Sequence, residues 1–150
     1  MNRHFSFASS HLIAAPSDAV FEVLADAEHW PQWWPQIRSV QPYDDTHGRA
    51  EIRSALPFTL RLELASEVTD RETGVLRASL TGDLVGWSEF VVRATGPATT
   101  ALDYAQEVDL RLPGRIGRIA CSAPARPLLL ANHALMIRRG MRGLETAAAR

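Results

Sequence analysis

The sequence predicts an α+β fold in which a curved antiparallel sheet of about six or seven strands wraps around one long C-terminal helix. Two observations carry this prediction. Between Ile37 and Arg111, apolar and polar residues alternate with a period of two, which indicates strands with one buried and one solvated face. From Pro127 to about Ala148 the pattern is helical. A sheet with one apolar face needs a cover, and only this last helix is long enough to provide it.

Size and composition favour one domain spanning residues 1–150, because a chain of 150 residues can bury a core without disulfides or metal. The net charge of −1 gives no reason to expect a nucleic-acid partner. Cys121 is the only cysteine, which indicates a reducing compartment. The first residues lack the apolar core of a signal peptide, and the longest apolar run, 128–131, is too short for membrane insertion. We therefore expect a cytoplasmic protein.

The N-terminal part is predicted to be one strand followed by two short helices. Residues 3–14 fit a strand, although their alternation is imperfect. Ser17 is a suitable N-cap after Pro16, and the apolar residues of 18–26 have helical spacing. The segment 29–37 holds three of the four tryptophans, but its two prolines preclude one continuous helix. We expect a short helix there, followed by a turn into a strand.

The middle of the chain reads as consecutive antiparallel strands. The clearest runs place on one face Leu60, Leu62, Leu64 and Val68, then Leu76, Ala78 and Leu80, then Leu102, Tyr104, Gln106, Val108 and Leu110. Turn residues separate the runs: Asp44-Asp45, Pro57, Thr73-Gly74, Gly82-Asp83 and Gly96-Pro97. After Pro113-Gly114 we expect a loop to about Pro124, and Pro127 suits the first turn of the final helix.

One stripe of the final helix is apolar and carries the only histidine of that helix. At 100° per residue the stripe contains Leu129, His133, Met136, Ile137, Gly140 and Leu144, with Asn132 at its edge. One interpretation of His133 is a buried histidine that is hydrogen-bonded to Tyr104, Gln106 or the backbone. The other is a pocket-lining group that orients or protonates a ligand, since its pKa is ordinarily near neutrality. The two are compatible if the pocket contains water.

Several motifs resemble the START-like proteins of the SRPBCC superfamily, and more narrowly the polyketide cyclase/dehydrase branch. They are residues 13–21 (IAAPSDAVF), 24–26 (LAD), 30–35 (WPQWWP), 82–87 (GDLVGW) and 125–140, which contains Asn132-His133. The resemblance covers essentially the whole chain. It implies the helix-grip fold with a cavity between the sheet and the long helix. It does not fix the function, because members include lipid carriers, hormone receptors, cyclases, oxygenase domains and co-chaperones.

Motif searches give no catalytic or metal signature. No two histidines have the spacing of metal ligands, and two histidines with a carboxylate cannot be placed for the iron site of the oxygenase branch. We therefore expect no metal and no cofactor. Cys121 follows Arg115 and Arg118, which can lower a thiol pKa, but an inert thiol is the preferred interpretation. The arginines of this segment are either a lip that attracts anions or simply solvated side chains, and we favour the second.

A mostly apolar pocket with a few convergent polar groups is what a small-molecule site requires. The large aromatic residues are either core or cavity walls. The candidate ligand-binding residues are Trp33, Trp34, Phe58, Leu62, Leu80, Trp87, Phe90, Tyr104, Gln106, Asn132, His133 and Met136.

Three functions remain open at this point. The first is binding of a hydrophobic or aromatic small molecule, such as a lipid, polyketide or isoprenoid, with Tyr104, Gln106 and His133 setting its orientation. The second is a cyclase or dehydratase in which His133 is the general base and Tyr104 a hydrogen-bond donor. The third is a protein-interaction module, for which the outward Leu128 and Leu135 are the only indication; they would serve a homodimer equally well.

Overall fold

The computed structural model describes residues 3–53 and 58–150. Seven strands, one short 3-10 helix and three α-helices follow one another in this part of the chain. In order they are β1 (His4–Ile13), α1 (Ser17–Ala25), η1 (Ala27–Gln32), β2 (Ile37–Pro42), β3 (His47–Ile52), β4 (Leu60–Asp70), β5 (Val75–Gly82), β6 (Leu84–Gly96), β7 (Thr99–Leu110), α2 (Gly114–Ala120) and α3 (Arg126–Ala148).

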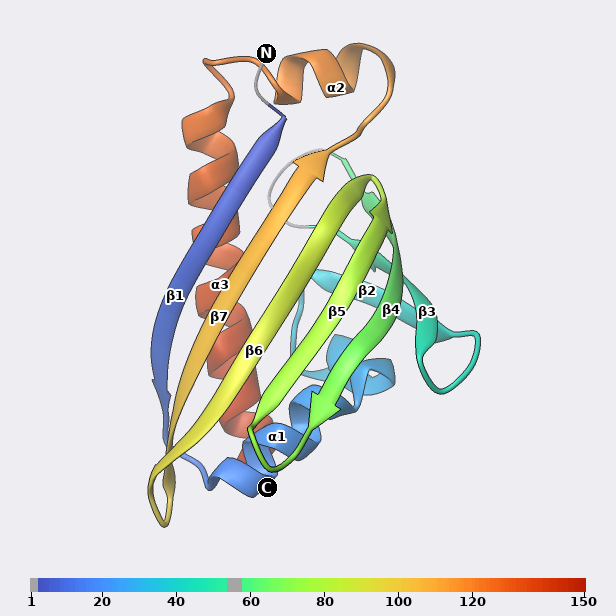
Figure 1. Cartoon of the computed structure of the whole chain (residues 1–150). Coiled ribbons are helices and arrows are strands. Elements are labelled where there is room, and N and C mark those ends of the chain that lie inside the picture. The colour runs from blue at the N-terminus through green and yellow to red at the C-terminus, as the bar shows by residue number, and fades with distance from the viewer. Residues whose placement is uncertain (1–2, 54–57) are drawn as a thin grey trace.

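The strands form one antiparallel sheet in the order β1-β7-β6-β5-β4-β3-β2. Neighbours in the chain are neighbours in the sheet, except that β1 pairs with the last strand, β7. The sheet curves, and α3 runs across its concave side behind β1, β7 and β6, while α1 and η1 close the lower end (Figure 1). This is the helix-grip arrangement that the sequence predicted, with seven strands.

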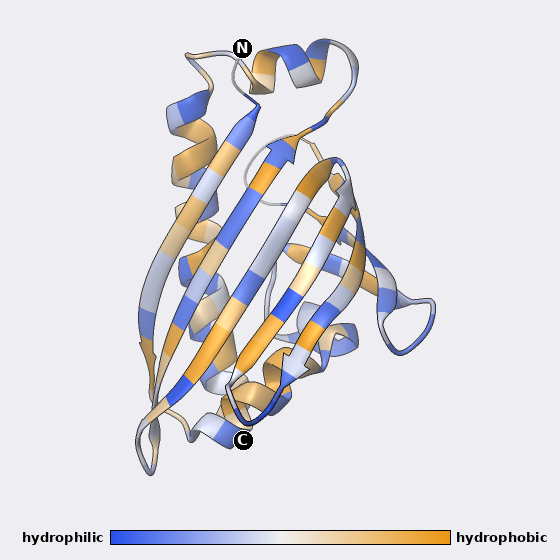
Figure 2. Cartoon of the chain, viewed as in Figure 1, coloured by the Kyte–Doolittle hydropathy of each residue, from blue (hydrophilic) through white to orange (hydrophobic). Residues whose placement is uncertain are grey.

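Alternation along the strands separates the concave face from the convex face, and the bands in Figure 2 follow it. In β7 the side chains of Leu102, Tyr104, Gln106, Val108 and Leu110 are all buried, and they point inward as predicted. Period-two patterning therefore places two polar side chains of one strand, Tyr104 and Gln106, inside the grip.

Three local predictions were wrong. Ser17 is not the N-cap of α1, because the helix begins at this residue, its N-cap position is Pro16, and no side chain caps it. The segment predicted as a loop from 113 to about 124 contains the helix α2, whose Gly117 and Ala120 are buried. Gly117 permits this because a Cβ there would overlap the carbonyl oxygen of Leu112. Val68 was placed on the buried face, but a bulge between Ser66 and Val68 shifts the register of β4, so Val68 is 38% exposed. The predicted turn at Pro57 lies outside the described residues.

The last helix is fixed to the rest of the fold mainly through its C-terminal half. Ile137, Met141 and Leu144 are buried there, in a core that also contains Trp34 and residues of α1. At Gly140, which belongs to the predicted apolar stripe, the helix meets Trp34. A Cβ on Gly140 would overlap the indole ring, and Trp34 Nε1 donates a hydrogen bond to the carbonyl oxygen of Met136 at 3.1 Å.

Candidate ligand-binding site

An apolar cavity of about 110 Å³ lies between the first half of α3 and the concave face of the sheet. Its walls come from β1, β7, α3 and the ends of β3, β4 and β6 that lie toward α2. Three polar side chains, Tyr104, Gln106 and His133, meet at this otherwise mainly apolar lining, together with Asn132. The arrangement provides an apolar surface with a local group of hydrogen-bonding atoms, which is the usual composition of a small-molecule site.

The polar side chains form a connected network across the sheet and the helix. His133 Nε2 lies 3.2 Å from Gln106 Oε1 and 3.5 Å from the Tyr104 hydroxyl. The Gln106 amide nitrogen donates to Ser88 Oγ at 2.7 Å, which leaves its oxygen directed at the imidazole. Because that oxygen accepts a hydrogen bond, Nε2 of a neutral His133 carries the proton and donates it. His133 is therefore bonded internally, as the first interpretation states, and it also lines the cavity, whereas its role toward a ligand stays a prediction.

Apolar neighbours determine the charge of His133. Its ring stacks on Phe7, with the ring centroids 3.5 Å apart and the planes at 8°. Burial lowers the pKa of His133 from 6.5 to about 4, because the imidazolium form loses its hydration there. Burial also raises the pKa of the Tyr104 hydroxyl far above its ordinary value. Both groups are neutral at physiological pH, so the site offers neutral hydrogen-bonding groups.

A second and larger hollow, about 780 Å³, opens beneath the cavity between α1–η1 and the concave face of β2–β6. Ser88 and Phe90 line it, whereas their partners Gln106 and Tyr104 line the upper cavity. Phe90 and Tyr104 are in ring contact with centroids 5.2 Å apart, and Ser88 is hydrogen-bonded to Gln106. These two side-chain pairs form a wall between the two spaces.

The structure brings six of the twelve candidate residues to the upper cavity. They are Phe58, Tyr104, Gln106, Asn132, His133 and Met136. Phe90 lines the lower hollow instead. Trp34, Leu62 and Leu80 are buried but line neither space, and Trp33 stacks on Trp34 with centroids 5.5 Å apart. Trp87 lies on the convex face, where the Arg77 guanidinium covers its ring at 4.2 Å.

Eight cavity residues were not among the candidates: Phe5, Phe7, Ile52, Leu60, Leu84, Val108, Leu110 and Leu129. For Leu60, Val108, Leu110 and Leu129 the signal was present, since they share the inward face of a predicted strand or the apolar stripe of the predicted helix. Phe5 and Phe7 alternate along the first strand, but nothing in the sequence indicated that this strand would pair with the last one and face the helix.

Cys121 is buried at the end of α2, and its sulfur lies 3.9 Å from the carbonyl oxygen of Leu110. Within residues 3–53 and 58–150, no three His, Cys, Asp or Glu side chains are grouped so that they could hold a metal ion. In the same part of the chain, no helix has the length and apolarity needed to cross a membrane.

Comparison with known proteins gives the same architecture. The structure resembles the Zhui aromatase/cyclase from Streptomyces sp. R1128 with a TM-score of 0.79 at 18% identity, covering 98% of this chain and 94% of that one. It also resembles a START superfamily protein from Mycobacterium smegmatis, with a TM-score of 0.72 at 17% identity, covering 96% and 97% of the two chains. At such identities the likeness shows the fold alone. Among curated proteins, none matches the sequence significantly.

The family model described as polyketide cyclase / dehydrase and lipid transport matches residues 4–149. Curved sheet, long helix and intervening cavity define the class of fold as the helix-grip fold, which this chain shares with that START superfamily protein. Within that class, this chain belongs to the polyketide cyclase / dehydrase and lipid transport family.

Proposed function

We propose that the protein binds a small hydrophobic or aromatic molecule that carries a carbonyl or hydroxyl group. The apolar part of the ligand occupies the cavity beneath α3, and its polar group bonds to Tyr104, Gln106 or His133. The observation that carries the proposal is the neutral network of Tyr104, Gln106 and His133, which meets an apolar space. Hydrophobic burial then provides affinity, at about 25 cal/mol per Å², while the network provides orientation.

The volumes constrain the size of the ligand. A cavity of about 150 Å³ accommodates benzene, so the upper space of about 110 Å³ is smaller than a one-ring site and takes a short chain or a small oxygen-bearing group. A lipid, polyketide or isoprenoid is larger and would extend past the wall of Ser88 and Phe90 into the lower hollow. We therefore expect ligands with a compact oxygen-bearing end and a longer apolar body.

Native mass spectrometry of the purified protein tests the proposal directly, since an apolar molecule should co-purify with it. Leu129→Trp should fill the upper cavity and abolish binding. The matched control is Leu128→Trp, because the neighbouring Leu128 is 65% exposed and does not line the cavity. Tyr104→Phe should weaken the binding of an oxygen-bearing ligand by about three- to tenfold, the usual effect of one lost hydrogen bond. A delipidated protein that binds nothing from a broad apolar library would refute the proposal.

A second candidate is a cyclase or dehydratase acting on a polyketide-like carbonyl compound. The observation in its favour is that the Tyr104 hydroxyl and the His133 ring meet at one cavity, with 3.5 Å between the hydroxyl oxygen and Nε2. Tyr104 would donate to the carbonyl oxygen, and Nδ1 of His133 would take the proton, since Nε2 already carries one and donates it to Gln106. The low pKa of His133, about 4, makes it a weak base, which favours the binding function. His133→Ala decides this candidate: full turnover in that variant would exclude the assignment.

A further inference from the structure

The end of the molecule that carries α2 combines exposed apolar side chains with arginines. The inner side of α2 is buried through Gly117 and Ala120, next to Cys121. The outer side presents Ile116 and Ile119, which are 52% and 66% exposed and lie three residues apart on the helix. Burial of one face has thus left two branched apolar side chains in solvent.

The start of α3 extends this apolar surface. Leu128 is 65% exposed, and it lies in the first turn of α3 at the same end of the molecule as α2 (Figure 1). Single exposed leucines are ordinary, but several at one end of a small protein indicate an interaction surface. Ile116, Ile119 and Leu128 are called the apolar tip below.

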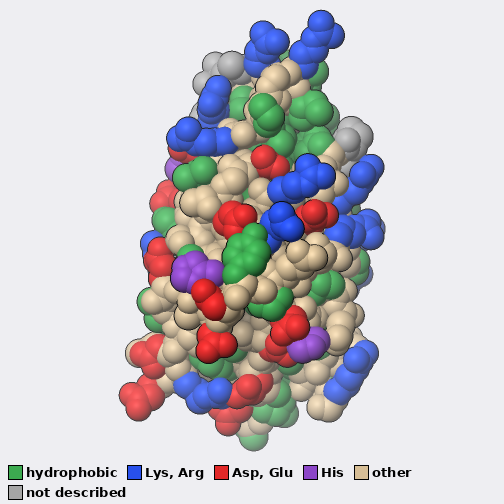
Figure 3. Space-filling model, turned by 90° about the vertical axis from the view of Figure 1, so that its right-hand side faces the viewer, with side chains coloured by type: hydrophobic (Ala, Val, Ile, Leu, Met, Phe, Trp, Pro, Cys, Tyr) green, Lys and Arg blue, Asp and Glu red, His purple; other side chains and the backbone are tan. Residues whose placement is uncertain are grey.

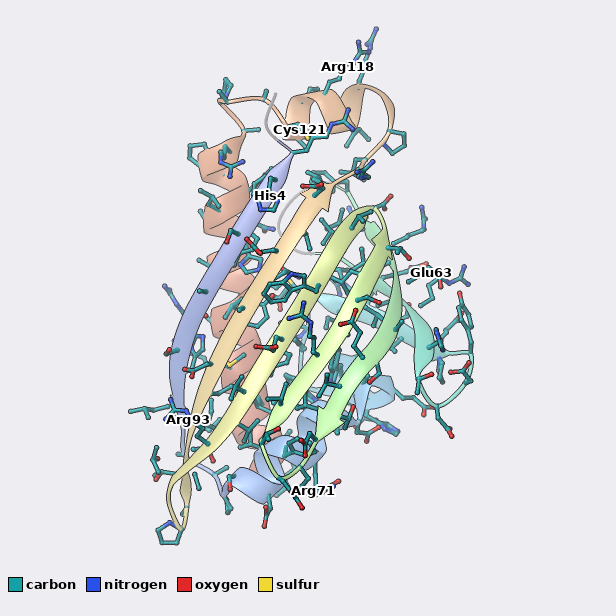
Figure 4. The ribbon with its side chains drawn as sticks, viewed as in Figure 1. His4, Glu63, Arg71, Arg93, Arg118 and Cys121 are labelled. Atoms are coloured by element: carbon teal, nitrogen blue, oxygen red, sulfur yellow. The ribbon has the colours of Figure 1, made fainter. Side chains whose placement is uncertain are left out.

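Arginines surround the apolar tip. A hollow of about 310 Å³ beside α2 is lined by Arg3, Arg111 and Arg118. Arg111 lies 3.9 Å from Asp109, whereas Arg118 projects away from the sheet (Figure 4). Residues 110–137, which run from the end of β7 through α2 into the first half of α3, contain four arginines and no Asp or Glu. In Figure 3 blue and green side chains share the upper end, and red ones gather lower down. The whole protein has a net charge of −1, so the positive charge of these arginines is a local property of this end.

We propose that this end docks on the surface of an anionic phospholipid membrane. The side chains of the apolar tip would enter the interface between headgroups and acyl chains, and the arginines would contact lipid phosphates. A second copy of the chain is a poorer partner, because a symmetric contact would bring arginines against arginines. The docking is peripheral and requires no membrane-spanning segment.

Docking would place the membrane next to the cavity. The apolar cluster beneath α2 contains Phe5 and Leu110, and Leu129 packs against it. All three residues also line the cavity. An apolar ligand could then pass between bilayer and cavity with little exposure to water. This consequence rests on the proposed binding function, whereas docking itself is independent of it.

Vesicle sedimentation tests docking with the whole chain. The protein should bind vesicles made of an equal mixture of phosphatidylcholine and phosphatidylglycerol. It should bind vesicles of phosphatidylcholine alone at least about tenfold more weakly. High salt should release it, because the attraction is screened over about a Debye length. The paired substitution Arg115→Gln/Arg118→Gln should lower the partition coefficient by about five-fold per arginine. Ile116→Ser/Ile119→Ser should lower it by more than tenfold.

Two controls match these variants. Leu12→Ser removes an apolar side chain that is 78% exposed in β1, outside the apolar tip, and Arg138→Gln/Arg142→Gln removes two exposed arginines of α3. Both should bind the mixed vesicles as the parent protein does. Circular dichroism of every variant checks that it is folded, and the arginine pair keeps the test decisive if the isoleucine pair does not fold.

Several outcomes would overturn docking. One is no preference for phosphatidylglycerol; another is an equal loss in the control variants. In a further outcome, inorganic phosphate releases the protein from the vesicles better than chloride does at the same ionic strength, while Ile116→Ser/Ile119→Ser leaves vesicle binding unchanged. That result would indicate a site for a free anion instead of docking. Sedimentation of the protein alone gives the last alternative: a dimer that the isoleucine pair converts to monomer would make the tip an interface between copies.

Discussion

The two halves of α3 differ in how closely they meet the rest of the fold. In the C-terminal half, residues 137–148, five residues are buried: Ile137, Gly140, Met141, Leu144 and Ala148. In the N-terminal half, residues 126–136, no residue is fully buried, and Leu129, Asn132, His133 and Met136 border the cavity. One continuous helix therefore holds the fold together at one end and encloses an unfilled space at the other.

Glycine and tryptophan account for this difference. Gly140 and Gly143 let α3 approach the tryptophan segment closely, because a Cβ at Gly140 would overlap the Trp34 ring and one at Gly143 would overlap the carbonyl oxygen of Trp33. No glycine lies in the N-terminal half, where Leu129, Asn132, His133 and Met136 line the cavity instead. A well-packed half thus fixes the position of a helix whose other half is free to line a cavity.

The largest expected effect is on the packed half. Leu144 is fully buried, so Leu144→Ala should lower the free energy of unfolding by about 2–5 kcal/mol. Leu129 borders the cavity and is only half-buried, so Leu129→Ala should cost no more than about 1 kcal/mol. Urea denaturation of both variants measures the difference. Equal losses of stability in the two variants would mean that both halves of α3 contribute alike to the stability of the fold. That result would contradict the contrast between a packed half and a cavity-lining half.

The next effect concerns the close approach at Gly143. Gly143→Ala raises helix propensity, which alone would stabilise by about 0.5–1 kcal/mol. The added methyl must nevertheless displace the backbone of Trp33, and overpacking costs about 1–3 kcal/mol. We expect net destabilisation with altered tryptophan fluorescence. The neighbouring Arg142→Ala, at an exposed position, is the control and should change neither quantity appreciably. A stabilised Gly143→Ala variant would show that the contact is not tight.

The same contrast explains what the sequence could and could not predict. Period-two runs predicted β7 correctly, including the inward direction of Tyr104 and Gln106, because alternation is a local property of a strand. The helical stripe likewise placed His133 toward the interior. Trp33 and Trp34 were expected at the cavity, yet Trp34 packs at Gly140 and Trp33 stacks on it, because their position depends on which half of α3 they meet. Such contacts between distant segments leave no periodic signal.

Two further features lay outside the reach of local patterns. The helix α2 is too short, and too rich in glycine, for its amphipathic pattern to stand out from a loop. Trp87 alternates correctly with its neighbours, but aromatic character alone suggested the interior, whereas a cation–π contact with Arg77 accommodates it on the convex face. In both cases the deciding interaction is tertiary.

The cavity half also gives rise to a pH dependence of stability. The pKa of His133 is about 4 in the folded protein against 6.5 for an exposed histidine, so between these values the unfolded chain binds more protons than the folded one. Stability must then fall as the pH falls through this window, by about 2 kcal/mol between pH 7 and pH 5.

The pKa values of His4 and His29 are raised by Asp109 and Asp26, so these two act in the opposite direction. Burial also lowers the pKa of His11, which acts in the same direction as His133. Comparing the parent protein with His133→Asn cancels the contributions of these other histidines, and the variant should lose the part of the decline that His133 causes. Identical profiles of stability against pH for the two proteins would show that the apolar surroundings do not hold the His133 imidazole neutral. The cavity network would then contain a charged histidine.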